Sequence, residues 1–205
     1  THDPASEQAD EQSEQANRES FRKIIGVVDP RVPVTMERFG DDKNPALVSE
    51  TDTYRVYQVR WPVLDGVHGE GLLLEPKGKI TTHVIALPDA DQLPEQIAGL
   101  APGVAPESQF ARHLAAAGAC VVVPTLISRD ITASGNPRIA LTNHPHREWI
   151  YRQAYQMGRD VIGYEVQKVL AAVDWIKDQA GPTATVGVAG YGEGGLIAFY
   201  AAALD

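Results

Sequence analysis

The last 20 residues of the chain, Val186–Asp205, have the sequence VGVAGYGEGGLIAFYAAALD and allow two interpretations. In both, an apolar strand leads through a glycine-rich turn into an apolar helix. In the first, the G-x-G-x-x-G spacing of Gly190–Gly195 forms a dinucleotide-binding turn. In the second, the turn is a nucleophile elbow, G-x-S-x-G, with Gly192 where the nucleophile should stand.

The position of this turn in the chain disfavours a dinucleotide-binding module. Such a turn usually follows the first strand of its domain, and an acidic residue about 20 positions later binds the ribose. Here at least three predicted strands come first, and the chain ends 10 residues after Gly195. Glu193 would also face the pyrophosphate with its carboxylate. The dinucleotide-binding module is therefore the weaker alternative. Tight NAD binding would support it.

Upstream of the turn, the sequence predicts alternating strands and helices. Strands are predicted at residues 53–64, 69–78, 82–88, 119–126 and 184–190, and helical segments at 109–118 and 147–179. The first two strands form a hairpin, and residues 89–108 form a loop. A polar excursion over 129–143 is expected above the sheet. This order predicts an α/β fold, with a hairpin followed by a mostly parallel sheet that helices cover on both faces.

The helical segment at 147–179 has the clearest periodicity. Its apolar positions recur every three or four residues, at Val166, Val169, Leu170, Val173 and Ile176.

The net charge of −9 is concentrated at the N-terminus. The first 20 residues hold six acids and one base, so they carry −5. Residues 1–22 are therefore predicted to form an acidic polar arm or helix, with the folded domain over residues 23–205. This arm is expected to be exposed to solvent. The alternative is an arm that docks on a partner. The mildly acidic remainder lacks the basic face of a nucleic-acid-binding protein, so no such partner is expected.

The composition is that of a globular protein and excludes a membrane-spanning one. Apolar residues make up 43% of the chain, as in globular proteins, and no apolar run approaches the roughly 20 residues of a membrane span. The one cysteine, Cys120, lies in the apolar run GACVVVP and is expected to be buried. The chain begins with Thr1, so a processed and exported protein is one interpretation, although the compartment stays unknown.

Four stretches together resemble the α/β-hydrolases, in particular the branch of the dienelactone hydrolases and acetyl xylan esterases. They are THVIALPDAD (82–91), ACVVVPTL (119–126), GRDVIGYEVQKVLAAVDWI (158–176) and VGVAGYGEGGLIA (186–198). The resemblance implies an α/β-hydrolase fold over its N-terminal part, ending after the elbow helix. It also implies a structural role, in packing and capping, for the stretch MGRD (157–160) before the apolar positions of the long helix.

The resemblance also implies roles for the residues of the elbow. Members carry Ser or Cys where this chain has Gly192, which has no side chain to attack a carbonyl. The oxyanion hole would use the amide of Glu193 and that of Asp89 or Ala90. Tyr191, just before the nucleophile position, would line the pocket.

The aspartates of the PDAD loop allow two interpretations. Members of the family often have His-Gly or glycine-rich sequence in this loop. Asp89 and Asp91 are expected to face solvent, as in an ordinary Asp-rich loop. If they pointed inward instead, they would disfavour a developing negative charge.

The remaining members of a catalytic triad have no counterpart after the elbow. In the family an acid and a histidine follow the nucleophile, whereas all six histidines here precede Gly192. His144 and His146 lack additional ligands nearby for a metal site, so neither a metal nor a cofactor is expected. A further chain or segment is expected to complete the sheet.

Three functions follow from these observations. The favoured one is a catalytically inactive hydrolase-like domain that binds a small ester or carbohydrate, or serves as a structural part of a larger protein. The alternative is a carboxylic-ester hydrolase of the acetyl xylan esterase or dienelactone hydrolase type whose nucleophile was changed to Gly192. The third is the dinucleotide-binding module.

Overall fold

A computed structural model describes residues 4–131, 136, 138 and 143–205, with side chains from Ser13 onward. Its seven-stranded sheet has the order β1-β3-β4-β6-β5-β7, and β2 also pairs with β3. The strands are β1 Glu37–Arg38, β2 Leu47–Glu50, β3 Tyr54–Leu64, β4 Val67–Pro76, β5 Thr82–Leu87, β6 Ala119–Pro124 and β7 Val186–Gly190. The helices are α1 Pro4–Ile24, α2 Pro94–Ile97, the 3-10 turn η1 Pro106–Ser108, α3 Phe110–Ala116, α4 His146–Gln156, α5 Val161–Ala180 and α6 Glu193–Leu204.

The sheet combines the predicted hairpin with the predicted parallel strands. β3 and β4 are antiparallel, and Gly66 lies in the turn between them with φ of 71°. β5 pairs in parallel with both β6 and β7, which confirms the parallel part of the sheet. The short, exposed strands β1 and β2 were not predicted, because they are too short and too polar to give a period-two pattern.

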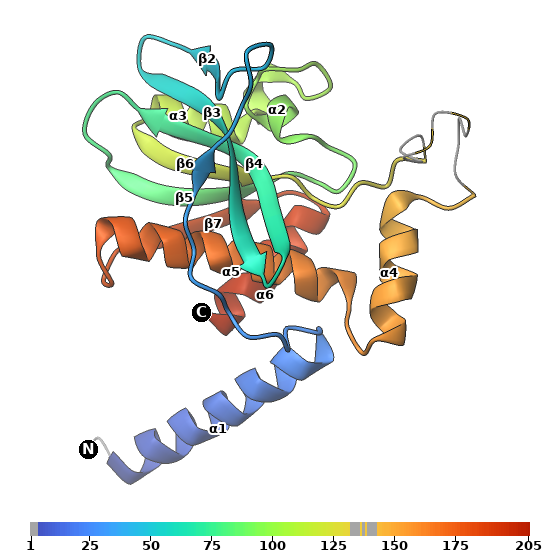
Figure 1. The fold of residues 1–205 in the computed structure, drawn as a ribbon. Helices are drawn as coiled ribbons and strands as arrows, with labels where there is room; N and C mark the ends of the chain where they lie inside the picture. The colour runs from blue at the N-terminus through green and yellow to red at the C-terminus, as the bar shows by residue number, and fades with distance from the viewer. Residues whose placement is uncertain (1–3, 132–135, 137, 139–142) are drawn as a thin grey trace.

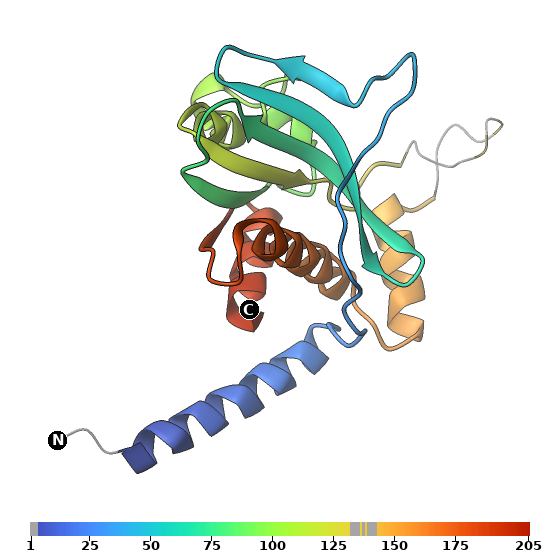
Figure 2. The same cartoon turned by 60° about the vertical axis from the view of Figure 1, so that its left-hand side comes forward.

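Helices cover both faces of the sheet, as predicted. α2 and α3 pack on one face and α5 and α6 on the other (Figures 1 and 2). Neighbouring residues of one strand serve opposite faces: Val84 packs toward α3, while Ile85 packs toward α5. The predicted loop at 89–108 is not wholly irregular, because it contains α2 and η1.

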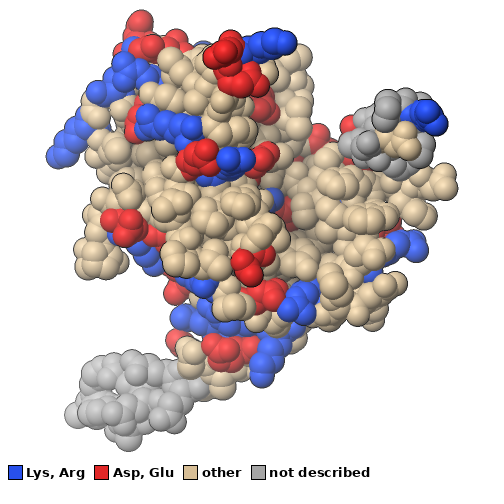
Figure 3. Space-filling model, in the orientation of Figure 1, with Lys and Arg blue, Asp and Glu red and all other residues tan. Residues whose placement is uncertain are grey.

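Charged side chains of both signs mix over the surface. On the face that Figure 3 shows, the acidic and basic residues of the described chain are interspersed. None of the described helices is long and apolar enough to cross a membrane.

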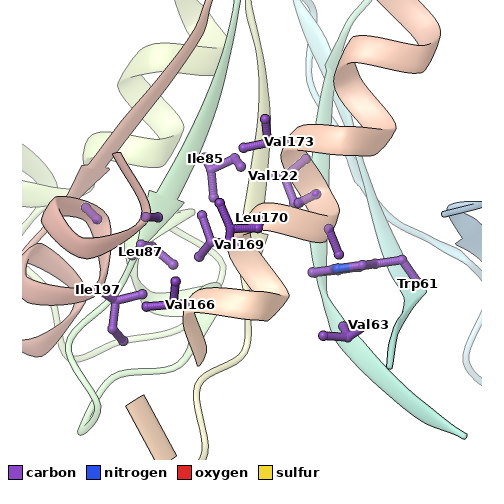
Figure 4. Packing of buried hydrophobic residues seen from close by; sticks show 14 of the residues in the cluster. Trp61, Val63, Ile85, Leu87, Val122, Val166, Val169, Leu170, Val173 and Ile197 are labelled. Carbon is purple, nitrogen blue, oxygen red and sulfur yellow. The ribbon is translucent and has the colours of Figure 1, made fainter. Parts of the chain in front are cut away.

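The larger core lies between the sheet and α5. Val166, Val169 and Leu170 of α5 are buried against Ile85 and Val122 of the central strands (Figure 4). Trp61 of β3 closes one end of this core, and its indole Nε1–H donates to the carbonyl oxygen of Lys168 at 3.2 Å. The periodicity in the sequence therefore identified the buried face of α5 correctly.

The helical segment expected over 147–179 is divided into α4 and α5. Gly158 between them has φ of 70°, which a helix does not accommodate. Asp160 caps α5, since its Oδ1 accepts from the amide of Ile162 at 2.8 Å. Arg159 binds Asp29 at 2.5 Å. The capping role predicted for MGRD is confirmed by Asp160, whereas Met157 is 59% exposed and the continuous helix is wrong.

The acidic N-terminus forms α1, which extends away from the body (Figures 1 and 2). Its C-terminal end makes contact with α6. The Phe21 and Tyr200 rings meet edge to face at 5.1 Å, and Arg22 donates to the carbonyl oxygen of Leu204 at 3.3 Å. A domain boundary between residues 22 and 23 stays a prediction, because the helix continues through it to Ile24.

Cys120 is buried in β6, as predicted, and this burial gives a testable reactivity. Burial raises the pKa of the Cys120 thiol to about 12, so at pH 8 only about one thiol in ten thousand is the reactive thiolate. We expect Ellman's reagent to label the folded chain far more slowly than the chain in concentrated guanidinium. Equal labelling rates in the two conditions would contradict the burial.

Candidate functional site

The candidate site lies at the bend where β7 passes into α6. Gly192 occupies this bend with φ of 56° and ψ of −125°, a conformation that residues with a side chain rarely adopt. Strand and helix approach closely on either side of it. A Cβ added at Gly190 would lie 2.3 Å from the backbone carbon of Gly194, and one added at Gly194 would lie 2.2 Å from the carbonyl oxygen of Pro88. The glycines therefore permit the sharp turn that the sequence predicted.

Two backbone amides converge on one carboxylate oxygen beside this bend. Asp89 Oδ1 accepts from the amide of Glu193 at 2.9 Å and from the amide of Ala90 at 2.8 Å. The amide of Asp89 itself points elsewhere, toward Gln92 Oε1 at 3.1 Å. Of the two amides considered beside that of Glu193, the structure therefore brings only that of Ala90 to the shared oxygen.

The expectation that both aspartates of the loop face solvent is wrong for Asp89. Asp91 is exposed and binds Arg129 at 3.1 Å, but the half-buried Asp89 turns inward. The reason lies in the space over Gly192. A Cβ at that glycine would lie 2.5 Å from Asp89 Cγ and 2.6 Å from each carboxylate oxygen. The carboxylate thus fills volume that a side chain at position 192 would need.

A chain of ion pairs extends from Glu193 into the interior. Glu193 binds Arg147 through one carboxylate oxygen and Arg129 through the other, the latter at 2.5 Å. Arg147 is nearly buried and binds the fully buried Glu165 at 3.1 Å. Lys168 completes the chain, 2.6 Å from Glu165. The elbow carboxylate is therefore tied to α4 and α5 through charge-assisted hydrogen bonds.

The same chain of ion pairs holds the segment that follows β6. The amide of Ile127 donates to Glu165 at 2.7 Å, and its carbonyl oxygen accepts from Arg147 at 2.9 Å. Lys168 donates to the carbonyl oxygen of Thr125 at 2.7 Å. Backbone groups at the end of β6 are thus satisfied by side chains of the helices.

The sequence analysis missed this network, although one signal for it was available. Glu165 lies four residues after Val161 and four before Val169, so it shares the buried face of α5. A carboxylate on such a face needs a cationic partner. The identity of that partner, Arg147, carries no comparable signal, because arginine at the start of a helix after a loop is ordinarily exposed.

The remaining predicted residues lie around the bend. Tyr191 precedes Gly192 and is 66% exposed, and its role in lining a pocket stays a prediction. His146 is the first residue of α4 and His144 precedes the helix by two residues, and both are exposed. Among the residues that the structure describes, no cluster of three or more His, Cys, Asp or Glu could hold a metal ion. Part of the excursion at 129–143 lies outside the described residues.

Comparisons with known proteins connect this geometry to a family. The sequence pattern of the dienelactone hydrolase family matches residues 95–205, more than half of the chain. No curated protein matches the chain by sequence.

Solved structures share the fold at low identity. A putative acetyl xylan esterase from Bacteroides fragilis NCTC 9343 matches with a TM-score of 0.69 and 18% identity over 95% of this chain and 50% of its own. Acetyl xylan esterase 1 from Thermoanaerobacterium sp. JW/SL YS485 matches with a TM-score of 0.55 and 14% identity over 92% of this chain and 54% of its own. A glucuronoyl esterase from Solibacter usitatus matches with a TM-score of 0.53 and 16% identity over 93% and 54%. The chain spans about half the length of these structures.

Proposed function

The chain belongs to the dienelactone hydrolase family of α/β-hydrolases, and from that premise we propose that it is an esterase-like domain without hydrolytic activity of its own. It acts in binding, or as a structural part of a larger protein. The observation that carries this proposal is Gly192, at the bend where the fold places a nucleophile. Acyl transfer begins with attack by a hydroxyl or thiol, and glycine has neither.

The orientation of Asp89 supports the proposal independently. An oxyanion hole works because its amides are free to bind the negative charge that develops on the substrate. Here the amides of Glu193 and Ala90 already bind the Asp89 carboxylate. A substrate carbonyl would have to displace this carboxylate first and would then lie close to its negative charge.

The position of the Asp89 carboxylate depends on Gly192. A Cβ at position 192 would lie 2.5 Å from Asp89 Cγ, so the carboxylate can stay on the two amides only while position 192 has no side chain. Occupation of the oxyanion hole by Asp89 therefore requires the loss of the nucleophile. A serine at position 192 would push the Asp89 side chain outward and free the amides.

The partners that we propose follow from the same family. The fold favours a small ester or carbohydrate as ligand, since the solved structures with this fold are named as esterases of such molecules.

We also propose that a further segment or chain completes the sheet. Within the described residues β7 pairs with β5 alone, and Leu196 and Phe199 of α6 are exposed beside it. An uncovered strand edge next to apolar side chains favours pairing with another strand.

One observation favours a second candidate, a carboxylic-ester hydrolase whose nucleophile was replaced. The bend at Gly192 keeps the strained geometry of an elbow, together with its close-packed glycines. In that case a serine or cysteine in the parent sequence would attack the ester carbonyl and pass its proton to a histidine that a further segment supplies together with an acid. The amides of Glu193 and Ala90 would hold the oxyanion while the alcohol leaves with that proton, and water would then release the acyl group as a carboxylic acid.

Hydrolysis of p-nitrophenyl acetate separates the two candidates. We expect no saturable turnover from the chain itself and no labelling by a fluorophosphonate probe. Gly192→Ser should displace Asp89 but stay unlabelled, because a serine is reactive only when a base such as histidine activates it, and all six histidines precede the elbow. Labelling of this variant would mean that the rest of a triad is present, and it would favour the second candidate. Gly66→Ser is the matched control, since Gly66 also has positive φ but has open space around it and lies far from the elbow.

Turnover by the unchanged chain would overturn the proposal. If Asp89→Asn abolished that turnover, the carboxylate beside Gly192 would itself take part in the reaction, as a nucleophile or as a general base. A serine or cysteine codon at position 192 in the parent gene would establish the second candidate instead.

A further inference from the structure

A cavity of about 580 Å³ lies beside α4 and the β3–β4 hairpin. Its walls come from the tip of the β3–β4 hairpin, the segment after α1, and α4 with the turn that follows it. Neither Asp89, Gly192 nor Glu193 lines it. The region of the surface around α4 is mostly uncharged (Figure 3). The cavity is therefore a separate feature of the fold.

Apolar side chains form most of this cavity, inside and at its mouth. Val63 and Ala154 are buried in its walls, whereas Val67, Trp149 and Met157 are 49%, 58% and 59% exposed. Grouped apolar side chains on a surface usually mark a contact site. The volume also falls within the roughly 300–1,000 Å³ of pockets that bind small molecules. These features fit a small ligand with an apolar body.

The charges of Arg159 and Lys168 in the cavity wall are already neutralised, and the third charged group there that is not part of these ion pairs, Asp65, is exposed to solvent. Arg159 binds Asp29 through two hydrogen bonds of 2.5 and 3.1 Å. Lys168 lies 2.6 Å from Glu165 and also donates to a backbone carbonyl. A charged ligand would find no buried counter-charge there and would lose its hydration.

We propose that this cavity binds an uncharged apolar molecule of drug-like size, with an aromatic or aliphatic body. The inference does not depend on hydrolysis or on the state of the elbow. A ligand seated there lies against Trp149, whereas Trp61 and Trp175 do not line the cavity. Trp149 is thus a built-in spectroscopic reporter.

The neutral dye N-phenyl-1-naphthylamine tests the proposal on the full chain. We expect saturable binding of one dye per chain, with energy transfer from tryptophan to the dye. Trp149→Phe should lower the transfer only in part, because energy transfer does not require contact and Trp61, whose indole donates to the cavity residue Lys168, is also within range. Gly192→Ser should leave binding unchanged, so this result is independent of the esterase assay.

A matched pair of valines provides the decisive comparison. Val67, 49% exposed at the start of β4, lines the cavity, and Val48, 45% exposed in β2, does not. Val67→Glu places a charge at the mouth and should weaken dye binding about tenfold or more. Val48→Glu should change it by less than about twofold. Circular dichroism of both variants confirms that each is folded.

Three results would overturn the inference. They are the absence of saturable binding, equal effects of the two glutamate variants, and energy transfer that survives Trp149→Phe unchanged. Loss of dye binding at high protein concentration, with dimerisation in sedimentation, would assign the cavity to a second copy of the chain instead.

Discussion

Replacing Arg147 by methionine is expected to lower the free energy of unfolding by about 3–5 kcal/mol, because it leaves a buried charge without its partner. Glu165 is fully buried, and Arg147 is one of its two cationic partners. The change also removes a donor to the carbonyl oxygen of Ile127 and a partner of Glu193. Methionine keeps much of the side-chain length, so lost packing contributes little.

Urea unfolding followed by circular dichroism measures this effect, and α4 offers a matched control. Arg152 lies on the same helix, but its ion pair with Glu148 is exposed. Arg152→Met should therefore cost at most about 0.5 kcal/mol. If Arg147→Met does not fold, Arg147→Lys keeps the charge without the forked geometry and should give an intermediate loss. Equal stabilities of Arg147→Met and Arg152→Met would contradict the assignment of a buried network.

Local patterns in the sequence predicted the framework of the fold. The apolar spacing of Val166, Val169 and Leu170 identified the inward face of α5, because a helix can bury only one stripe of side chains. The run from Val84 to Leu87 identified a central strand for a similar reason, since both of its faces are covered. The glycines of the elbow were identified from their spacing, because a strand and a helix can approach closely at such a turn only where small residues flank it.

The details of the site depend on contacts between distant residues, which local patterns do not contain. Asp89 and Glu193 meet across 104 positions of sequence. The inward turn of Asp89 depends on the empty volume over Gly192 and on two amides that no pattern within the PDAD loop reveals. The break between α4 and α5 had a local signal in Gly158, but the apolar periodicity outweighed it.

Gly192 and the ion pairs together explain how the elbow is held without a nucleophile. The amide of Glu193 binds Asp89, while its carboxylate binds Arg147 and Arg129. The first residue of α6 is thus held at both its backbone and its side chain. A carboxylate next to the helix N-terminus is also favourably placed with respect to the helix dipole. The bend is consequently an ordered element of the domain.

Gly194→Ala is expected to cost about 3 kcal/mol of the free energy of unfolding, although alanine normally favours a helix. The added Cβ would lie 2.2 Å from the carbonyl oxygen of Pro88 and 2.5 Å from that of Leu87, so α6 would have to move away from β5. The movement would also separate the amide of Glu193 from Asp89. Thermal and urea unfolding would measure the loss.

Gly195→Ala is the control for this change, because it makes the same substitution one residue later in the same helix. Its nearest contact, the carbonyl oxygen of Gly190, would lie 3.2 Å from the new Cβ, and the helix propensity of alanine favours the change by up to about 1 kcal/mol. We therefore expect Gly195→Ala to be neutral within about 1 kcal/mol. Similar losses for both variants would mean that any side chain added in the first turn of α6 lowers the stability. The contact between Gly194 and β5 would then not be the specific cause.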